Sequence, residues 1–304
     1  MNNLMKLFVF SLVLFFSMNF VSYGQLPYSE DQFRAFNAKG DPVTMADIIK
    51  AAGGADVVFL GEQHDDPVGH AIEAEVLRRV FATYAADRKV DLSMEMFEKD
   101  VQIVLNEYLS SLITEKQFLD ASRPWGNYKT DYRPLVEFAK EKKIEVIAAN
   151  GPRRYVNMVS RGGRDTLNAL SKQAKEWLPP LPYRAASEAY SKKFKALMGP
   201  SAEAQMGLDN ILSSQSLWDA SMAYSVAQAL KRNKHALVVH LNGGFHTESR
   251  LGTVEHLLGY RPKARALVVT MVAENDFQNF VSSKHTGLGD FVVLTDAKLP
   301  RSKR

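Results

Sequence analysis

The pattern of hydrophobic and polar positions predicts strands that alternate with helices. Short apolar runs predict strands at residues 57–60, 90–96 and 144–149. Between and before these runs, capping residues and prolines mark helix starts, and we expect the main helices at residues 45–52, 67–86, 99–112 and 134–142. Strands that alternate with helices in this way are typical of a parallel sheet covered by helices.

The middle of the chain has a different pattern, without a convincing strand signal. Helical composition occupies residues 167–177, 183–198 and 202–232, and strands resume at 236–241, 266–272 and 291–294. We therefore predict the α/β class: a mostly parallel β-sheet flanked by helices, with a smaller inserted helical subdomain. The sheet domain is expected to comprise residues 25–150 and 234–300, and the insert residues 151–233. Residues 25–43 are expected to form an irregular lead-in.

Residues 1–24 have the pattern of a signal peptide. Lys6 precedes an apolar stretch over residues 7–20, and Ser22 and Gly24 place small residues where signal peptidase cleaves. The stretch is short for a membrane span, although an uncleaved anchor stays open as the alternative. We expect export through this signal peptide to a periplasmic or extracellular location.

Composition narrows the chemistry further. The chain has no cysteine, which excludes disulfides, thiolate metal ligands and a lipid anchor attached through cysteine. Hydrophobic residues make up 46% of the chain, enough for a sizeable core, and the net charge of +4 is slight and evenly spread. Because nucleic-acid binding requires a concentrated basic surface, we expect no nucleic-acid partner.

Two histidine motifs follow predicted strands. Gly61-Glu62-Gln63-His64 follows residues 57–60, and Gly243-Gly244-Phe245-His246 follows residues 236–241. Each predicts a buried strand that runs into a Gly-X-X-His turn. Since ligand sites form at the carboxyl ends of parallel strands, both imidazoles are expected in one site.

Further polar residues end the neighbouring strands. They are Glu95, Glu98, Asn150 and Asn242. Glu95 interrupts an apolar strand, which costs free energy unless the carboxylate is paired or binds a ligand. Imidazole and carboxylate groups suit a divalent transition metal ion or general acid–base chemistry. Structural explanations stay open, because acidic neighbours let His64 simply begin a helix and Glu98 cap one.

The other histidines are expected to have no part in this chemistry. His70 and His240 are interpreted as structural, whereas His235, His256 and His285 are expected at the surface. The same cleft could instead take haem, which needs an apolar slot, an axial Tyr, His or Met and cations for its propionates. The aromatic and basic segment over residues 125–133 is not a haem motif and is more simply read as a packed loop.

The motifs together resemble the ChaN-like family, in the superfamily that also holds Tiki-type proteins and erythromycin-esterase-like enzymes. The matching segments are residues 59–65, 93–98 and 241–246, and the likeness spans roughly residues 40–295. The resemblance implies a parallel sheet with helices and a smaller helical domain. It also implies a haem-binding protein of bacterial iron uptake that binds stacked haems at a homodimer interface. ChaN-like proteins are often lipoproteins, and this chain lacks the cysteine that a lipid requires.

Tiki-type members of this superfamily resemble metalloproteases whose two Gly-X-X-His motifs and a glutamate hold the metal. Carried over, those metal ligands are His64, Glu95 and His246. Esterase-like members use a comparable histidine and glutamate to activate water, which makes Glu62 the candidate catalytic base. Glu98, Asn150 and Asn242 are further candidates at the edge of the site.

Two functional hypotheses follow from these residues and the resemblance. The first is an exported ChaN-like protein that binds haem or iron, in bacterial iron or haem uptake. Its axial haem ligand stays open, and haem binding is expected to tolerate loss of His64. The alternative is a metal-dependent hydrolase that uses the two Gly-X-X-His motifs and a divalent transition metal ion. A third hypothesis is a scaffold that binds a partner protein through the helical insert.

Overall fold

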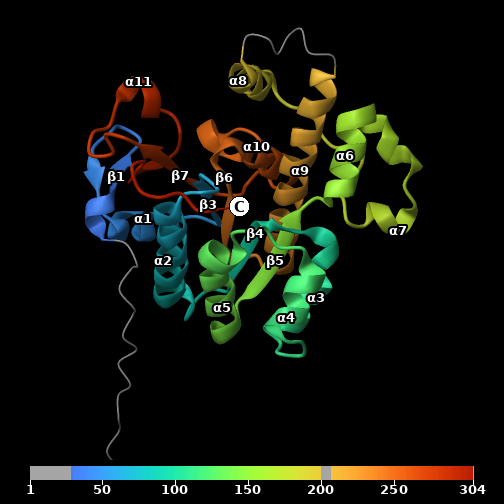
Figure 1. Ribbon diagram of the computed structural model, residues 1–304, viewed down its shortest axis with the longest axis horizontal. Coiled ribbons are helices and arrows are strands. Elements are labelled where there is room, and N and C mark those ends of the chain that lie inside the picture. Colours follow the sequence, from blue (N-terminus) through green and yellow to red (C-terminus); the bar gives the residue numbers. More distant parts are fainter. Residues whose placement is uncertain (1–28, 200–206, 304) are drawn as a thin grey trace, which may run out of the picture.

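An eight-stranded sheet runs through the molecule (Figure 1), and the computed structural model describes residues 29–199 and 207–303. In spatial order the strands are β2 (Pro42–Val43), β1 (Phe33–Asn37), β8 (Phe291–Asp296), β7 (Ala266–Glu274), β3 (Val57–Glu62), β6 (Leu237–Gly243), β4 (Val90–Glu98) and β5 (Glu145–Asn150). The pairs from β8 to β5 are parallel, and β1 is antiparallel to β2 and β8. The predicted α/β class with a mostly parallel sheet is confirmed.

Helices cover both faces of the sheet because successive strand residues point to opposite sides. In β3, Val58 and Leu60 pack in one core with the first group of helices, whereas Val57 and Phe59 pack in a second core with the last group. The first group comprises α1 (Met45–Ala52), α2 (Pro67–Tyr84), α3 (Gln102–Leu109), α4 (Glu115–Ser122) and α5 (Arg133–Lys142). The last group comprises α9 (Leu208–Arg232) and α10 (Thr253–Tyr260).

The register of the central strands brings their carboxyl ends together. Gly61 of β3 lies opposite Asn242 of β6, and Glu62 lies opposite Gly243. Strand β4 pairs with the other side of β6, and β5 pairs with β4 through a register shift between Met94 and Glu98. The polar residues that end these strands therefore meet at one edge of the sheet.

The described residues between β5 and β6, 151–199 and 207–236, form helices joined by loops and include no strand. It holds α6 (Arg153–Gly162), a 3-10 helix (Arg164–Ala169), α7 (Lys172–Lys175), α8 (Glu188–Met198) and α9. Helix α9 packs against α6 with Leu217 and Ala220 and against the sheet with Val226 and Leu230. Because α9 contributes residues to both cores, the helical insert packs continuously with the sheet. The predicted boundaries of the insert, residues 151–233, stay a prediction.

Some local predictions were wrong. Residues 33–37 form β1 rather than an irregular lead-in, because Ala35 and Phe36 are buried when this strand pairs with β8. Helices α6 and α10 were not predicted. His256 and His285 are 5% and 2% exposed rather than at the surface.

The predicted signal peptide, residues 1–24, lies outside the described residues. Within the part of the chain that is described, no helix combines the length and the apolar character that crossing a membrane requires.

Candidate functional site

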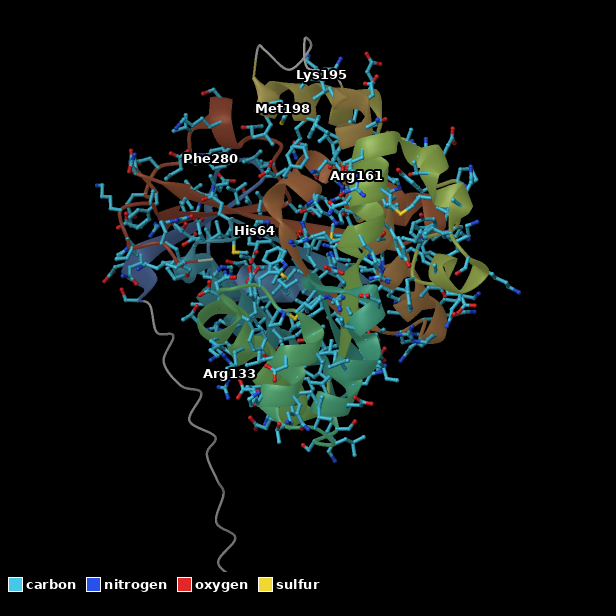
Figure 2. All side chains as sticks on the ribbon, turned by 45° about the vertical axis from the view of Figure 1, so that its right-hand side comes forward. His64, Arg133, Arg161, Lys195, Met198 and Phe280 are labelled. Carbon is cyan, nitrogen blue, oxygen red and sulfur yellow. The ribbon has the colours of Figure 1, made fainter. Side chains whose placement is uncertain are left out.

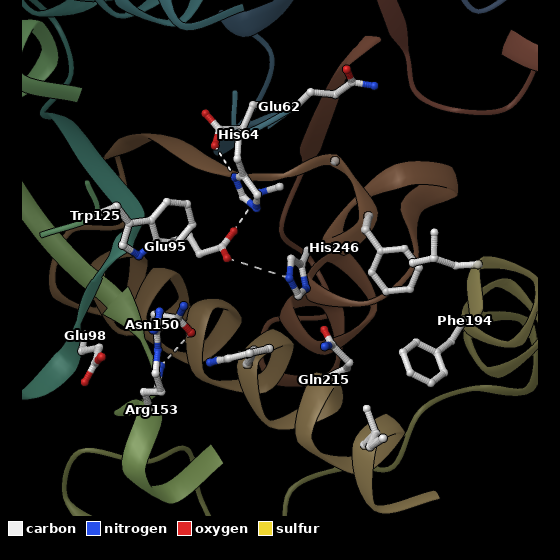
Figure 3. Close-up of a pocket in the computed structure, with 18 of the residues that line it drawn as sticks. Glu62, His64, Glu95, Glu98, Trp125, Asn150, Arg153, Phe194, Gln215 and His246 are labelled. Carbon is white, nitrogen blue, oxygen red and sulfur yellow. Dashed lines mark hydrogen bonds and ion pairs between the residues drawn. The ribbon is translucent and has the colours of Figure 1, made fainter. Parts of the chain in front are cut away.

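A cavity of about 490 Å³ opens at the carboxyl ends of β3, β4, β5 and β6 (Figure 3). The sequence-predicted residues that line it are Glu62, His64, Glu95, Glu98, Asn150 and His246. Asn242 does not line the cavity. It is fully buried, and its Nδ2 donates to Thr247 Oγ1 at 3.0 Å. Two strand ends thus deliver both histidines to one cavity, as expected of a parallel sheet.

The first Gly-X-X-His turn presents His64 to this cavity. The Nδ1 atom of His64 lies 2.5 Å from Glu62 Oε1, and the side chain is 27% exposed. The other edge of the ring rests on Gly243, where an added Cβ would lie 2.7 Å from Cε1 and Nε2. The indole of Trp125 packs edge-on at 4.8 Å between ring centroids. Because Nδ1 faces a carboxylate it carries the proton, which leaves the lone pair of Nε2 available.

Glu62 is anchored by residues behind the cavity. The Tyr132 hydroxyl donates to Glu62 Oε1 at 2.7 Å, and His70 Nδ1 lies 2.9 Å from Oε2. Burial alone would raise the pKa of Glu62, but the charge of His70 and hydrogen bonds from His64 and His70 hold that pKa well below its usual range. Glu62 is therefore a carboxylate that orients His64, and a weak proton acceptor at neutral pH.

His70 and Glu73 complete a buried cluster with Glu62. Among the described residues, these three bring ligand-type atoms within 4.8 Å of one another, as a metal site would. Ion pairing and hydrogen bonding account for the same spacing, since His70 Nδ1 lies 2.9 Å from Glu62 Oε2 and hydrogen-bonds to Glu73 Oε2 at 3.1 Å. Burial opposes protonation of His70, yet the charge of Glu62 raises its pKa to about 11. Burial and the charge of Glu62 raise the pKa of Glu73 well above its usual range. Both shifts favour protonation of His70 and Glu73 beside the Glu62 carboxylate, so charge pairing within the cluster is consistent with its spacing.

The second Gly-X-X-His turn holds His246 more deeply. Its Nδ1 lies 2.8 Å from Asp219 Oδ1, and its Nε2 lies 3.9 Å from Glu95 Oε1. Thr253 donates to the same Asp219 oxygen at 2.8 Å. Burial would lower the pKa of His246, but the charges of Asp219 and Glu95 raise it to about 9. The imidazole of His246 is therefore held as a cation between two carboxylates.

Glu95 and Gly243 connect the two turns. Glu95 Oε2 accepts a hydrogen bond from the Gly243 N–H at 2.7 Å, which satisfies a carboxylate that lies in an apolar strand. Of the predicted metal ligands, His64 and Glu95 thus meet at Gly243, and His246 Nε2 lies 3.9 Å from Glu95 Oε1. Within the described residues, their ligand atoms are not among the groups that come within 4.8 Å of one another.

Several site residues have no counterpart in the sequence predictions. Asp219, Gln215 and Trp218 come from α9, and Arg153 comes from the start of α6. An acidic residue within the apolar side of α9 is the signal that would have singled out Asp219. The rest of the lining is mainly apolar and aromatic: Trp125, Trp218, Phe194, Phe245, Ile211, Leu197 and Met198.

Comparison with known proteins identifies the fold. The structure described as cofacial heme binding to ChaN of Campylobacter jejuni matches with a TM-score of 0.66 and 17% identity, over 88% of this chain and 98% of that one. An erythromycin esterase structure matches with a TM-score of 0.47 and 13% identity, over 87% and 83% of the two chains.

A sequence relative and a family model add to this likeness. The chloroplastic protein RETICULATA-RELATED 5 of Arabidopsis thaliana is 24% identical over 237 residues, which are 73% of this chain. This chain spans about a third of that protein, 32% of its length. The family model described as haem-binding uptake, Tiki superfamily, ChaN matches residues 48–257. The chain belongs to this family of ChaN, the haem-binding uptake proteins of the Tiki superfamily.

Proposed function

We propose that this protein binds haem in the cavity at the carboxyl edge of its sheet and that His64 Nε2 ligates the iron. The observation that carries the proposal is the state of this imidazole. Its Nδ1 is fixed on Glu62, its ring borders the cavity, and no described residue hydrogen-bonds to Nε2. The sequence leaves the axial ligand open, and this proposal differs from the expectation that haem binding tolerates loss of His64.

The other donors in the lining are less suitable for iron. Haem iron is held by His, Cys, Met or Tyr side chains. Among the described lining residues there is no tyrosine or cysteine, and His246 faces carboxylates with both ring nitrogens. Met198 lines the cavity but is 39% exposed. His64 is the donor that has both an anchor and a ring nitrogen to which no described residue hydrogen-bonds.

The cavity has the character that a porphyrin requires. Its volume lies within the range of about 300–1,000 Å³ that is usual for small-molecule sites. Its walls include the rings of Trp125, Trp218 and Phe245, which supply apolar area, and Arg153 supplies a cation. Bound haem would supply a Lewis-acidic iron for His64. Glu62, itself held by Tyr132 and His70, would fix the tautomer and raise the basicity of that ligand.

The proposed cellular role adds export, uptake and dimerisation to haem binding. We infer export through the signal peptide of residues 1–24 to a periplasmic or extracellular location, and a role in bacterial haem or iron uptake as a homodimer. The sequence pattern supports export, and the family description supports uptake. Intact-mass measurement of the protein secreted by a bacterial host tests the first inference, since cleavage after Gly24 gives a defined mass.

A haemin titration of residues 25–304, followed by difference absorbance, tests haem binding. We expect a saturable Soret shift, with one haem per chain or two for stacked haems. His64→Ala should weaken binding at least about 100-fold. His235→Ala is the matched control, because His235 is exposed at the opposite edge of the sheet. A non-saturating response would overturn haem binding, and equal affinities for the two variants would overturn the ligand assignment.

The second candidate function is a metal-dependent hydrolase, favoured by the meeting of both Gly-X-X-His turns in one cavity. In this alternative His64, Glu95 and His246 hold a divalent ion and Glu62 is the base. The low pKa of Glu62, the two hydrogen bonds at its Oε1 and the ion pair of its Oε2 with His70 make it a weak base. Elemental analysis of the purified protein tests the alternative, which requires a stoichiometric divalent ion that His246→Ala loses.

A further inference from the structure

One side of the cavity is formed where β5 passes into α6. Strand β5 ends at Asn150, and α6 begins at Arg153 after Gly151 and Pro152. Asn150 and Arg153 both line the cavity, and Figure 3 shows them together on one side, away from His64. The position is one where helix N–H groups face a ligand space.

The start of α6 carries cations where a helix normally favours anions. Arg153 and Arg154 occupy the first two helical positions, the first turn has no acidic residue, and Pro152 provides no side-chain cap. Positive charge at a helix N-terminus is unfavourable, and the first N–H groups of a helix have no intrahelical partner. An anion bound at this end would relieve both conditions.

Arg153 is the arginine of this region that has no carboxylate partner among the described residues. Its neighbour Arg154 pairs with Asp100 at 2.5 Å and lies over the rings of Tyr155 and Trp177. The nearby carboxylate of Glu98 is 3.2 Å from Arg123. The acidic groups at this side of the cavity are therefore occupied, and the guanidinium of Arg153 stays available.

Asn150 gives an independent indication of a ligand. The residue is 7% exposed, and its Oδ1 accepts a hydrogen bond from the Gly151 N–H at 2.9 Å. Its Nδ2 donates to no described residue, although the side chain borders the cavity. A largely buried side chain whose amide donor meets the cavity rather than a described acceptor is placed to donate to a bound molecule.

We infer that the β5–α6 junction is an acid-binding subsite, in which Arg153, Asn150 Nδ2 and the first N–H groups of α6 bind a carboxylate of the ligand. The inference rests on the proposed function and deepens it. Haem carries two propionates on one edge of its ring, and this subsite orients that edge while His64 binds elsewhere on the molecule. The ligand class is thus a porphyrin with free acid groups.

Porphyrins without iron separate this subsite from ligation by His64. Protoporphyrin IX and its dimethyl ester differ only in their acid groups, and the cavity tryptophans Trp125 and Trp218 report binding through fluorescence quenching. The folded chain of residues 25–304 is expected to bind the diacid at least about 10-fold more tightly than the diester, as charge-assisted hydrogen bonds imply. Arg153→Gln and Asn150→Ser should each reduce that preference several-fold.

Arg161→Gln is the matched control, because Arg161 is an exposed arginine in the last turn of the same helix (Figure 2). It should keep the full preference for the diacid, as should His64→Ala. Equal preference in Arg153→Gln and Arg161→Gln would overturn the subsite, as would a wild-type chain that binds diacid and diester alike or binds neither.

The two proposals fail in different measurements. Haemin affinity that does not respond to His64→Ala, together with a diacid preference that depends on Arg153, would reject iron ligation and support the subsite. Haemin affinity that depends on His64, without any diacid preference, would reject the subsite and support ligation. Thermal melting of each variant in the absence of porphyrin excludes misfolding. Arg153 is exposed and pairs with no described carboxylate, and its charge at a helix N-terminus is unfavourable, so its loss should leave the melting temperature equal to or slightly above that of the wild type.

Discussion

The two Gly-X-X-His turns share a sequence pattern and a place in the fold, but their histidines lie in different surroundings. His64 is bonded to Glu62 of its own turn, and its side chain is 27% exposed. His246 is bonded to Asp219 of α9, and its side chain is 8% exposed. The motif determines where the imidazole lies, whereas the carboxylate partner and its surroundings determine what the imidazole does.

The two turns also differ in which group carries the positive charge beside the carboxylate. Glu62 already has a cationic partner in His70, which lies 2.9 Å from its second oxygen. Asp219 is fully buried, and its hydrogen-bond partners include Thr253, which is neutral. The positive charge against Asp219 therefore rests on His246, whose pKa is raised to about 9. A protonated imidazole has no free lone pair for a metal, so the first turn is suited to ligation and the second to holding the fold.

The largest difference is expected in stability. His246→Ala should lower the free energy of unfolding by about 4 kcal/mol, because it leaves the buried charge of Asp219 without its cation. His64→Ala should cost less than about 1 kcal/mol, because its side chain is partly exposed and Glu62 keeps Tyr132 and His70. Urea denaturation measures both, with His235→Ala as the surface control. Equal losses for the two histidines would contradict the asymmetry.

The pH dependence of stability isolates the second turn. The pKa of His246 is raised from 6.5 to about 9, so its contribution is fully present below pH 6.5 and is lost as the pH rises through 9. In Asp219→Asn the main cause of this raised pKa is absent. The stability difference between wild type and Asp219→Asn should therefore shrink by on the order of 3 kcal/mol between pH 6.5 and 9.

His70 contributes a slope of its own over this range, because its pKa is also raised, to about 11. That slope is common to both proteins and cancels in their difference. Urea denaturation at several pH values gives the measurement. A stability difference that stays constant from pH 6.5 to 9 would show that Asp219 does not hold the charge of His246.

Much of the fold was predictable because its signals are local. Apolar runs placed β3, β4 and β5, and caps and prolines placed α1, α2 and α5, whose observed bounds lie close to the predicted ones. Strand β1 had no such signal, because it is short and buries its residues only by pairing with β8 at the other end of the chain. Helix α6 was missed because its first turn carries two arginines, Arg153 and Arg154, where helices usually carry acids.

The candidate site was likewise predictable only in part. The strand-end residues were found because parallel strands align their carboxyl ends, and this rule needs no tertiary information. Asp219 and Trp218 were not found, since their contribution depends on how α9 lies across the sheet, and packing decides that orientation. The sequence therefore indicated both histidines. It could not show that His64 pairs with Glu62 of its own turn, whereas His246 pairs with Asp219 of α9.

Gly243 lies between the two turns, and its replacement tests whether haem binding depends on the position of the His64 ring. A Cβ at Gly243 would lie 2.7 Å from Cε1 and Nε2 of His64, so Gly243→Ala must displace the imidazole. We expect about a 10-fold loss of haemin affinity, the usual scale for disturbing the support of a metal ligand. The control is Gly259→Ala in α10, where an added Cβ meets no atom within 4 Å. Equal haemin affinity in the two variants would show that binding does not depend on this position of His64.

The smallest effect is expected from Arg301, near the C-terminus, which hydrogen-bonds to the segment of the first Gly-X-X-His turn and not to the second turn. Arg301 donates to Gln63 Oε1 at 3.1 Å and to Asp65 Oδ1 at 2.8 Å. Arg301→Gln should cost at most about 1 kcal/mol of unfolding free energy, and less at high salt, because these partly exposed pairs are screened by solvent and ions. Lys303→Gln, which removes a charge from the same tail, controls for net charge. Since Glu62 orients His64 from behind the cavity, haemin affinity should stay within about 2-fold of wild type. A large loss of affinity on removal of Arg301 would mean that the surface tie, rather than the buried carboxylate, orients the first turn.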